Sequence, residues 1–501
     1  MMSGDLTRRH LLTLAGASAA AGFGAAGCTS DCADQRPCPP ADAARVYVSR
    51  PDLTPPAVTV ARHPGAEDSR LILLDVPYSG PGRGGTLILD SGGEVTWFGP
   101  NSQTERRLNF AVQSYRGNPV LTWFQGLVVQ GYGRGELVIA DSSYQVQQVI
   151  RPEGGELADF HDFVITPEGH ALITIYRQHA HVDLSAVGGP PSGYLISGVA
   201  QEIEIETGKL LFEWDSKDHV PVHETYQELG SGDGGSGTRT RPFNYFHINS
   251  LALDADGDLL ISSRNTWTVY KVRRDGTGAV VWRLNGKKSN FTMGPGSRFS
   301  WQHDARPHPG GLLTVFDNGA SPAEEERRSR ALILDVNRAA RHVTLRQAFA
   351  HPGRRLVAAA MGSAQLLPDG LMVVGWGTEP EFSVFAPDGH LLLDGRIANG
   401  AASYRAVADH WIGHPAEPPA AAVRRRLGRT TVYASWNGET TIASWAVLAG
   451  PTRDSLAEAG SAPRSGFETS IEVRDRGPYF AVEARDARRR VLARSRSLTV
   501  P

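Results

Sequence analysis

Cysteine is almost absent from this chain of 501 residues. Its three cysteines are Cys28, Cys32 and Cys38, so no thiol occurs after position 38. The rest of the chain therefore has no cysteine nucleophile, no cysteine-ligated zinc and no iron–sulfur cluster. If Cys28 is lipidated, Cys32 and Cys38 are left free to pair across a short loop.

A surplus of charge of either sign is also absent. The chain has 51 basic and 53 acidic residues and a formal net charge of −2. These totals give no electrostatic support for a nucleic acid or a membrane surface as a partner. The sequence carries no indication of an oligomeric state.

Long amphipathic segments with the period of a helix are missing after residue 30. Glycine and proline are abundant instead, with 55 and 32 residues. Both residue types favour turns. The composition therefore suits a chain with many short elements rather than a helical protein.

The N-terminus has the features of an export signal. The stretch LTRRHLLTLAGASAAAGFGAAGC places Arg8 and Arg9 before a weakly apolar run rich in alanine and glycine. A basic pair followed by His-Leu-Leu resembles a twin-arginine signal. The alternative is a single transmembrane helix, for which the run is short and weakly apolar.

The end of this stretch, GAAGC, resembles the cleavage box of bacterial lipoproteins, with Cys28 as the residue to be lipidated. Ala25 stands where a larger aliphatic residue is more usual, and cleavage without lipidation is the alternative. We expect a signal over residues 1–28 and a linker over 29–55. The protein is then exported and held at the cell surface, outside the cytoplasm, through Cys28.

The body of the chain repeats a two-stranded unit with a polar turn. Six copies occur, at residues 85–98, 135–150, 201–215, 268–284, 331–347 and 381–397. A second kind of hairpin precedes most of them, at residues 161–176, 247–264, 303–318 and 361–377. The two hairpins together make a four-stranded unit. Six such units predict an all-β fold, a six-bladed β-propeller over residues 56–415; a pair of β-sandwiches is the alternative.

A second domain is predicted after the propeller. The segments TTVYASWNGETTIASWAVLAG and PYFAVEARDARRRVLARS contain short strands with alternating apolar residues. They predict a small β-sandwich of the immunoglobulin or fibronectin type over residues 425–501. Extra strands packed on the propeller are the alternative.

Three of the inner hairpins begin with a histidine: His161, His247 and His303. The distances from these residues to the turn glycines are eight, ten and eight residues, which are all even. If the strands are regular, the three side chains face the same way; a bulge would void this inference. The first strand of each propeller blade lines the central channel, so we expect the three rings to converge there.

Arg264 ends the strand that pairs with the one begun by His247. Its guanidinium cannot lose its proton and offers five donors to an oxyanion. Three histidines alone would favour a metal site, but with an arginine they favour an anion site. A structural role would be the better interpretation of any one of these histidines alone.

The motifs around these residues resemble one known family. They are NYFHINSLALDADGDLLISSRNTWTVYKV, VVWRLNGKKSNF, FSWQHDARPHPGGLLTVFDNG and GWGTEPEFSVF. They resemble the bacterial arylsulfotransferases that do not use a nucleotide sulfate donor. The resemblance implies a six-bladed propeller without a cofactor or metal. It also implies ping-pong transfer of a sulfuryl group from a phenolic sulfate ester to a phenolic acceptor through a sulfated histidine.

The resemblance also implies roles for single residues. His303 is expected as the nucleophile. His247 and Arg264 are expected to hold the sulfuryl oxygens. His161 is expected as a further sulfate contact or as the acid and base for the phenolic oxygen. A neutral imidazole is a good nucleophile near pH 7, and cationic donors stabilise the charge of a transferring group.

Other residues near the motifs are candidates with two interpretations. Four of them are expected to line the substrate pocket, with packing between blades as the alternative for the aromatic ones: Trp301, Tyr245, Asn249 and Trp376. Asp162 and Asp304 follow two of the histidines, where each either orients the neighbouring ring or caps a turn. For Asp317 and Asn318 we expect a turn rather than a contact with a histidine.

The chain departs from some members of the family. It lacks their large N-terminal sheet domain and their paired cysteine, and it has a C-terminal sandwich candidate instead. It therefore resembles a shorter, lipoprotein-like branch. Two other functions stay open on the sequence: a non-catalytic binding propeller at the cell surface, and a metal- or histidine-dependent hydrolase or lyase on the same fold.

Overall fold

The computed structural model of the protein describes residues 44–66, 69–78, 83–319, 328–474 and 477–499. The expected signal, Cys28 and the pairing of Cys32 with Cys38 lie outside these residues. No helix within the described ranges is long and apolar enough to cross a membrane. The protein is nearly all β, as predicted, and one short α-helix, α1 (Ser216–His219), occurs in the described part.

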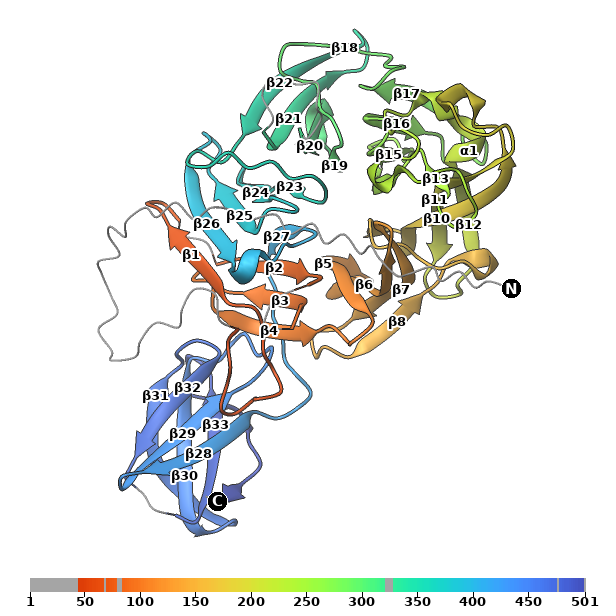
Figure 1. Ribbon diagram of the computed structural model, residues 1–501. Coiled ribbons are helices and arrows are strands. Elements are labelled where there is room, and N and C mark those ends of the chain that lie inside the picture. The colour runs from red at the N-terminus through yellow and green to blue at the C-terminus, as the bar shows by residue number, and fades with distance from the viewer. Residues whose placement is uncertain (1–43, 67–68, 79–82, 320–327, 475–476, 500–501) are drawn as a thin grey trace, which may run out of the picture. The chain divides into compact units, whose positions relative to one another are not determined.

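Six sheets, antiparallel apart from the pairings of β13 (Phe243–Asn244) and β18 (Thr292–Met293), make up most of the chain, and we number them 1 to 6 (Figure 1). Sheet 1 contains β27 (Ala406–Asp409), β2 (Leu71–Val76), β3 (Gly85–Leu89) and β4 (Val95–Pro100). Sheet 2 contains β5 (Arg106–Tyr115), β6 (Asn118–Val129), β7 (Tyr132–Ala140) and β8 (Val146–Ile150). Sheet 3 contains β9 (Phe163–Ile165), β10 (His170–Val182), β11 (Gly193–Glu204) and β12 (Leu210–Asp215), and β13 (Phe243–Asn244) pairs with β11.

Sheet 4 contains β14 (Ile248–Leu253), β15 (Leu259–Ser263), β16 (Thr268–Val272) and β17 (Val280–Leu284). Sheet 5 contains β19 (His303–His308), β20 (Leu312–Asp317), β21 (Arg330–Asn337), β22 (His342–Phe349) and the short β18 (Thr292–Met293). Sheet 6 contains β23 (Ser363–Leu366), β24 (Met372–Gly375), β25 (Glu381–Phe385), β26 (Leu391–Ile397) and β1 (Val58–Arg62). Each sheet is written from its innermost strand outwards, and β18 and β1 are outer edge strands.

All ten hairpins expected from the sequence are present in these sheets. The six outer ones are the last two main strands of each sheet, and the four others are the first two strands of sheets 3 to 6. Two innermost pairings were not expected. One is the hairpin of β5 and β6, and the other joins β27 to β2 from the opposite end of the chain.

Side chains link each sheet to the next. In every sheet, one side chain accepts a hydrogen bond from a backbone N–H at the innermost strand of the following sheet. The pairs, in order from sheet 1, are Asp75 with Phe110, Gln113 with Ile165, Asp162 with Leu251, Ser250 with Ala305, Asp304 with Ala364, and Ser363 with Ala406. The last pair returns to sheet 1, so the six sheets form a closed ring.

The apolar core lies between the sheets rather than at the centre of the ring. Each pair of neighbouring sheets shares one cluster of buried apolar side chains, for example Leu260 of sheet 4 with Val315 of sheet 5. Their burial supplies most of the free energy that stabilises such a fold. The centre is thereby left to polar side chains, among which the predicted site residues lie.

Two further sheets follow the ring. One contains β28 (Ala420–Arg426), β29 (Arg429–Ser435) and β32 (Glu468–Val473). The other contains β30 (Ser444–Thr452), β31 (Ser455–Pro463), β33 (Tyr479–Arg485), β34 (Val491–Arg494) and β35 (Leu498–Thr499). They share one apolar cluster that includes Val432 and Val482.

Candidate active site

The three histidines of the predicted site lie together at the centre of the ring, and all three are buried. The ring centroids of His161 and His247 are 4.9 Å apart, with the rings nearly perpendicular. Burial holds the pKa of His247 well below its ordinary value, and the charges of His161, Arg264 and His303 lower it further. The predicted convergence of the three side chains is therefore present.

The premise of that prediction is wrong, because the backbone at these residues is not regular. His161 precedes β9, and His247 precedes β14 with a left-handed φ of 56°. β19 begins at His303, but its pairing is irregular up to Arg306, and Asp304 has a φ of 54°. A non-glycine residue pays an energetic penalty in this conformation, which is common at functional sites. Local turns, not strand parity, aim the rings.

Each histidine ring is held at Nδ1 by a different polar group. The partner of His161 is Asp159 Oδ2, at 2.7 Å. The partner of His303 is Asn318 Oδ1, at 2.8 Å, so the expectation that Asn318 serves only a turn is wrong. In all three rings, contacts at Nδ1 leave Nε2 for chemistry.

The hydrogen bonds of Asn318 assign the tautomer of His303. The amide nitrogen of Asn318 donates to the carbonyl oxygens of Ala358 and Met361, both at 3.0 Å. The amide oxygen is therefore the atom that faces His303, and it can only accept. His303 then carries its proton on Nδ1, and its Nε2 has a free electron pair.

His247 has the opposite arrangement. Its Nδ1 lies 2.9 Å from the amide nitrogen of Asn244. The amide oxygen of Asn244 has no partner within the described part of the chain. The reverse orientation would leave a buried N–H group unpaired, which is rarer than an unpaired carbonyl. We therefore assign Asn244 as the donor, so His247 accepts at Nδ1 and carries its proton on Nε2.

His303 is neutral over the ordinary pH range for physical reasons. Burial holds its pKa well below the ordinary value, and the positive charge of Arg264 lowers it further. The hydrogen bond to Asn318 opposes this shift but does not reverse it. His303 and His247 thus present an electron pair and an N–H, respectively, without a charge on either ring.

Arg264 lies beside His247, as the sequence predicted. Its backbone N–H donates to the carbonyl of His247 at 2.9 Å. Its Nη1 and Nη2 donate to Asn265 Oδ1 and to the carbonyl of Ala359, each at 3.0 Å. Its Cζ lies 4.6 Å from the ring centroid of Trp301, in a cation–π contact. Trp301 therefore contacts a predicted catalytic group.

The other expected pocket residues have different places. Tyr245 is fully buried and donates to the carbonyl of Val220 at 3.1 Å. Trp376 is also fully buried, and its Nε1 donates to Ser383 Oγ at 2.9 Å. Both belong to apolar clusters between sheets, so packing is the interpretation that holds for them. Asn249 donates to the carbonyl of Gln302, the residue before His303, at 2.6 Å.

Asp162 and Asp304 are not the partners of the neighbouring rings at Nδ1, and they do more than cap a turn. Their carboxylates bind the guanidinium groups of Arg306 and Arg405. Asp317 accepts hydrogen bonds from the backbone N–H groups of Ser300 and Gly319, as expected of a turn residue.

Sequence reasoning missed several residues around the rings. Asp159 and Asn244 hold two of the Nδ1 atoms, and Tyr176 lies with its ring centroid 5.4 Å from both His161 and His247. Tyr404 donates to the carbonyl of His161 at 2.8 Å. A polar residue two or three positions before a histidine was a usable signal for Asp159 and Asn244. Tyr404 precedes a strand that pairs far along the chain, so it gave none.

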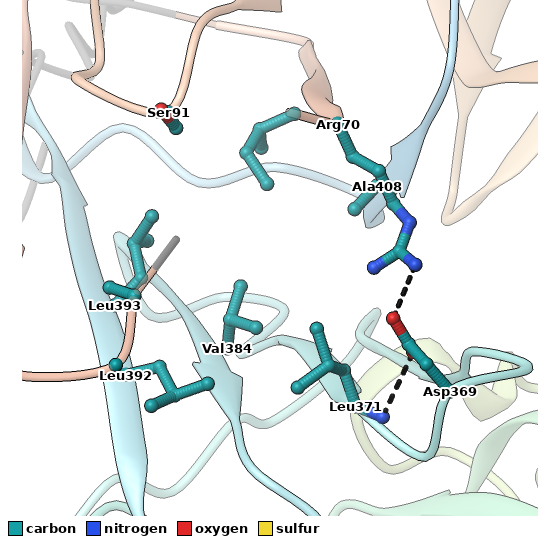
Figure 2. A pocket seen from close by; sticks show the side chains of 11 residues that line it. Arg70, Ser91, Asp369, Leu371, Val384, Leu392, Leu393 and Ala408 are labelled. Atoms are coloured by element: carbon teal, nitrogen blue, oxygen red, sulfur yellow. Dashed lines mark hydrogen bonds and ion pairs between the residues drawn. The ribbon is translucent and has the colours of Figure 1, made fainter. Parts of the chain in front are cut away.

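A cavity of about 240 Å³ lies between sheets 1 and 6 and is lined largely by apolar side chains; Figure 2 shows the side chains around it. Leu371, Val384 and Leu393 are among them, and an ion pair joins Arg70 to Asp369 at its side. None of the predicted site residues lines it. Within the described ranges, no group of three or more histidine, cysteine or acidic side chains is arranged to hold a metal ion.

Solved structures with similar chains are remote. They include a protein of unknown function from Bacteroides caccae, with 13% identity, a TM-score of 0.40, and coverage of 68% of this chain and 99% of that one. Virginiamycin B lyase from Staphylococcus aureus has 8% identity and a TM-score of 0.34, covering 68% and 98%. A protein from Lactobacillus plantarum has 14% identity and a TM-score of 0.35, covering 81% and 99%. Likenesses of this size support no argument.

The family comparison is more informative. No curated protein matches the chain. A family model described as arylsulfotransferase (ASST) matches residues 111–398, which is more than half of the chain and includes all three histidines and Arg264. The chain therefore belongs to the arylsulfotransferase family.

Proposed function

We propose that the protein transfers a sulfuryl group from a phenolic sulfate ester to a phenol, through a covalent intermediate on His303. The observation that carries this proposal is the tautomer of His303. A neutral ring whose Nδ1–H is fixed by Asn318 has its electron pair on Nε2, where a nucleophile needs it. Membership of the arylsulfotransferase family supports the same chemistry.

In the first half-reaction, Nε2 of His303 attacks sulfur. A nitrogen–sulfur bond forms, and the bond from sulfur to the phenolic oxygen breaks. The electron pair leaves with the phenolic oxygen, which takes a proton from Nε2 of His161; the His161 ring enters this step with a proton on each nitrogen and leaves it neutral. Asp159 accepts the Nδ1–H of His161 and can stabilise the ring when it carries two protons.

In the second half-reaction, His161 removes the proton of the acceptor phenol. The phenolic oxygen then attacks sulfur and releases His303 with its electron pair on Nε2. Both half-reactions spread negative charge over three sulfuryl oxygens. Arg264 and the Nε2–H of His247 are the donors assigned to those oxygens, because neither has an electron pair to offer as a nucleophile.

The ring of sheets has a corresponding interpretation. We infer that sheets 1 to 6 are the blades of a six-bladed β-propeller and that residues 420–499 form a separate β-sandwich. The ring closure through Ser363 and Ala406 and the single apolar cluster of the last two sheets support this interpretation. β27 then closes the propeller by pairing the end of the ring with its beginning.

The place of the protein in the cell is proposed from the sequence alone. We propose export by a twin-arginine signal and a lipid anchor on Cys28. Labelling of cells with a radioactive fatty acid should mark the protein, and Cys28→Ala should remove the label. Persistence of the label in that variant would contradict the anchor.

The function is tested by turnover of a chromogenic aryl sulfate with a panel of phenols. The expected result is phenol release that depends on the acceptor, together with sulfated acceptor. Donor alone should leave an adduct of sulfuryl mass on His303. A stable adduct on His161 or His247 would reverse the assigned roles, and the absence of both turnover and adduct would leave a binding protein.

A further inference from the structure

Three buried charged side chains and one partly exposed arginine form a closed group next to the histidines. We call Asp162, Asp304, Arg306 and Arg405 the charge quartet. Arg306 lies 2.9 Å from Asp162 Oδ2 and 2.8 Å from Asp304 Oδ1. Arg405 lies 2.9 Å from Asp162 Oδ1 and 3.6 Å from Asp304 Oδ1. Each arginine therefore bridges both carboxylates.

Both carboxylates of the quartet are ionised. Burial alone would raise the pKa of Asp304, but Arg405 and Arg306 lower it to about 2. The same two guanidinium groups outweigh burial at Asp162 and lower its pKa. The quartet thus holds two positive and two negative charges in a buried place.

The quartet is joined directly to the nucleophile and to the acid–base histidine. Asp162 and Asp304 are the residues that follow His161 and His303 in the chain. Nη2 of Arg405 donates to the carbonyl oxygen of His161 at 3.0 Å. Asp304 holds the left-handed φ of 54° directly after His303. The direction of both rings therefore depends on backbone that the quartet fixes.

The quartet also contacts every sheet of the ring. Its own members belong to sheets 3 and 5 and to the residue before β27 of sheet 1. Its further partners are the N–H and the carbonyl of Leu251 in sheet 4, the N–H of Ala364 in sheet 6 and the amide oxygen of Asn109 in sheet 2, at 2.7 to 3.0 Å. No single sheet can shift without changing these contacts.

Stability alone does not explain an ion-pair group in which three of the four charged side chains are buried. Replacing a buried ion-pair group by apolar side chains of similar volume is often neutral or stabilising, because desolvation offsets the attraction between the charges. An apolar group of the same size would close the ring equally well. What it would not do is fix carbonyl and carboxylate positions at His161 and His303 through directional hydrogen bonds.

We propose that the charge quartet is a positioning device for sulfuryl transfer, and that Arg405 is its central positioning residue. This inference rests on the proposed function. Arg405 comes from the strand that closes the ring and binds Asp162, the carbonyl of His161 and Asn109 with three hydrogen bonds. The pairing that closes the ring is thereby coupled to the orientation of the histidine rings.

The first experiment compares Arg405→Met with the wild-type protein in single turnover with a chromogenic aryl sulfate. The expected result is a fall of roughly 100-fold in the rate of phenol release, since a displacement of about 1 Å has that effect on a reacting group. KM for the donor should change less than kcat, because Arg264 and His247 still face the sulfuryl oxygens. An unchanged rate would overturn the proposal.

The matched control is Arg274→Met. Arg274 also forms a two-pronged ion pair with a buried carboxylate, at 2.7 and 2.9 Å from Glu202, but it contacts no site residue. The thermal midpoint of Arg274→Met should fall as that of Arg405→Met does. The transfer rates of Arg274→Met should stay at the wild-type level. An equal loss of rate in both variants would mean that lost stability, not lost positioning, explains the effect, and would overturn the proposal.

A variant in which the quartet carries no charge distinguishes a positioning role from a structural role, even if Arg405→Met fails to fold. The variant carries Asp162→Asn, Asp304→Asn, Arg306→Met and Arg405→Met together, so no buried charge is left unpaired. We expect its thermal midpoint to approach that of the wild type while its transfer rate stays low. Recovery of the rate together with stability would show a structural role only.

A pH profile gives an independent result. The groups that act on the pKa of His303 include Arg264, His161 and Arg405; His247 interacts with His303 as well, and Asp304 is the next residue in the chain. Loss of Arg405 leaves the quartet with a net negative charge, so the acid limb of kcat/KM should move to higher pH. An unmoved limb would contradict the coupling between the quartet and the nucleophile.

Failure of the proposed function gives a different pattern. Wild-type protein that neither releases phenol nor forms an adduct contradicts sulfuryl transfer itself. Wild-type transfer that Arg405→Met retains in full contradicts only the positioning role.

Discussion

The two halves of the ring are sheets 3 to 5 and sheets 6, 1 and 2. Both have residues with a left-handed backbone at their innermost strands, but their side chains there differ. Left-handed residues occur at the innermost strands of both, at His247 and Asp304 in one half and at Asn109 and Met361 in the other. Side chains also link neighbouring sheets in both. Among the described innermost strands and the residues directly before them, histidines of the predicted site occur only in the half formed by sheets 3, 4 and 5. The fold therefore supplies equivalent positions all around the ring, and three of them carry these histidines.

The strongest test of this difference is His303→Ala beside His351→Ala. Loss of the imidazole at His303 removes the only electron pair assigned to attack sulfur, so both half-reactions should stop and no sulfuryl adduct should form. His351 is also buried, but its Nε2 lies 3.2 Å from Asp394 Oδ1 in sheet 6, so its substitution should leave turnover near the wild-type level. Mass spectrometry after incubation with donor alone checks both. Full turnover in His303→Ala would end the covalent scheme.

The second largest effect is expected at Arg264. Arg264→Ala removes a preorganised cationic donor to the sulfuryl oxygens, so each half-reaction should slow by roughly 100-fold. Trp301→Leu removes the aromatic surface under the guanidinium but leaves the charge, so a smaller loss should follow. Separate measurement of phenol release and of transfer to the acceptor tests this order. A larger loss in Trp301→Leu would mean that Trp301 binds the substrate directly.

Two asparagines allow the assigned tautomers to be tested against each other. In Asn244→Asp, the new carboxylate only accepts, so a neutral His247 must place its proton on Nδ1 and lose the donor at Nε2. Near neutral pH, the reaction rate should fall by about 100-fold, which is the effect of losing one oxyanion donor. The loss should shrink at lower pH, where a second proton restores Nε2–H.

Asn318→Asp should behave differently. His303 already donates from Nδ1, so a carboxylate at this place keeps its tautomer and raises its pKa. The variant loses the donors to Ala358 and Met361 but keeps the nucleophile, and the loss of rate should be smaller than in Asn244→Asp. The check is the rate of phenol release as a function of pH in both variants. A larger loss of rate in Asn318→Asp than in Asn244→Asp would mean that the tautomers assigned to His247 and His303 must be exchanged.

Much of this arrangement was readable in the sequence because it is local. A hairpin puts its own ends side by side, so the neighbourhood of His247 and Arg264 followed from one stretch of chain. The repeat of that stretch then predicted the other histidines of the site. Membership of the arylsulfotransferase family agrees with the resemblance of the motifs.

What the sequence did not reveal depends on distant pairings and on local irregularity. β27 pairs with β2 across most of the chain, so neither the closing strand nor Arg405 stood out. The bulge after His303 gives its ring a direction that strand parity cannot supply. Tyr245 and Trp376 flank the motifs as pocket residues would, yet a flanking position does not decide whether a ring faces the centre or the core between sheets.

The smallest predicted effect again compares the two halves, through Asp75 and Asp304. Both are buried, and each accepts the backbone N–H of the next sheet. Burial dominates at Asp75 and raises its pKa to about 6, whereas Arg405 and Arg306 overcome burial at Asp304 and lower its pKa to about 2. Both carboxyl groups thus make the same kind of link between sheets. The Asp75 carboxyl resists ionisation, whereas the Asp304 carboxyl ionises readily.

The two shifts have opposite consequences for stability. A raised pKa means that the folded state holds its proton more tightly than the unfolded state, so the contribution of Asp75 is full below pH 4 and is lost as the pH rises through about 6. Two pKa units correspond to about 3 kcal/mol in the free energy of unfolding. Asp75→Asn removes this titration, so denaturant unfolding should give a wild-type stability that falls relative to the variant between pH 4 and 6.

For Asp304→Asn the divergence should lie at lower pH, because the stability from Asp304 is present above pH 4 and is lost as the pH falls through about 2. Parallel curves for wild type and Asp75→Asn from pH 4 to 6 would mean that folding does not raise the pKa of Asp75, and this part of the contrast between the two halves would be wrong.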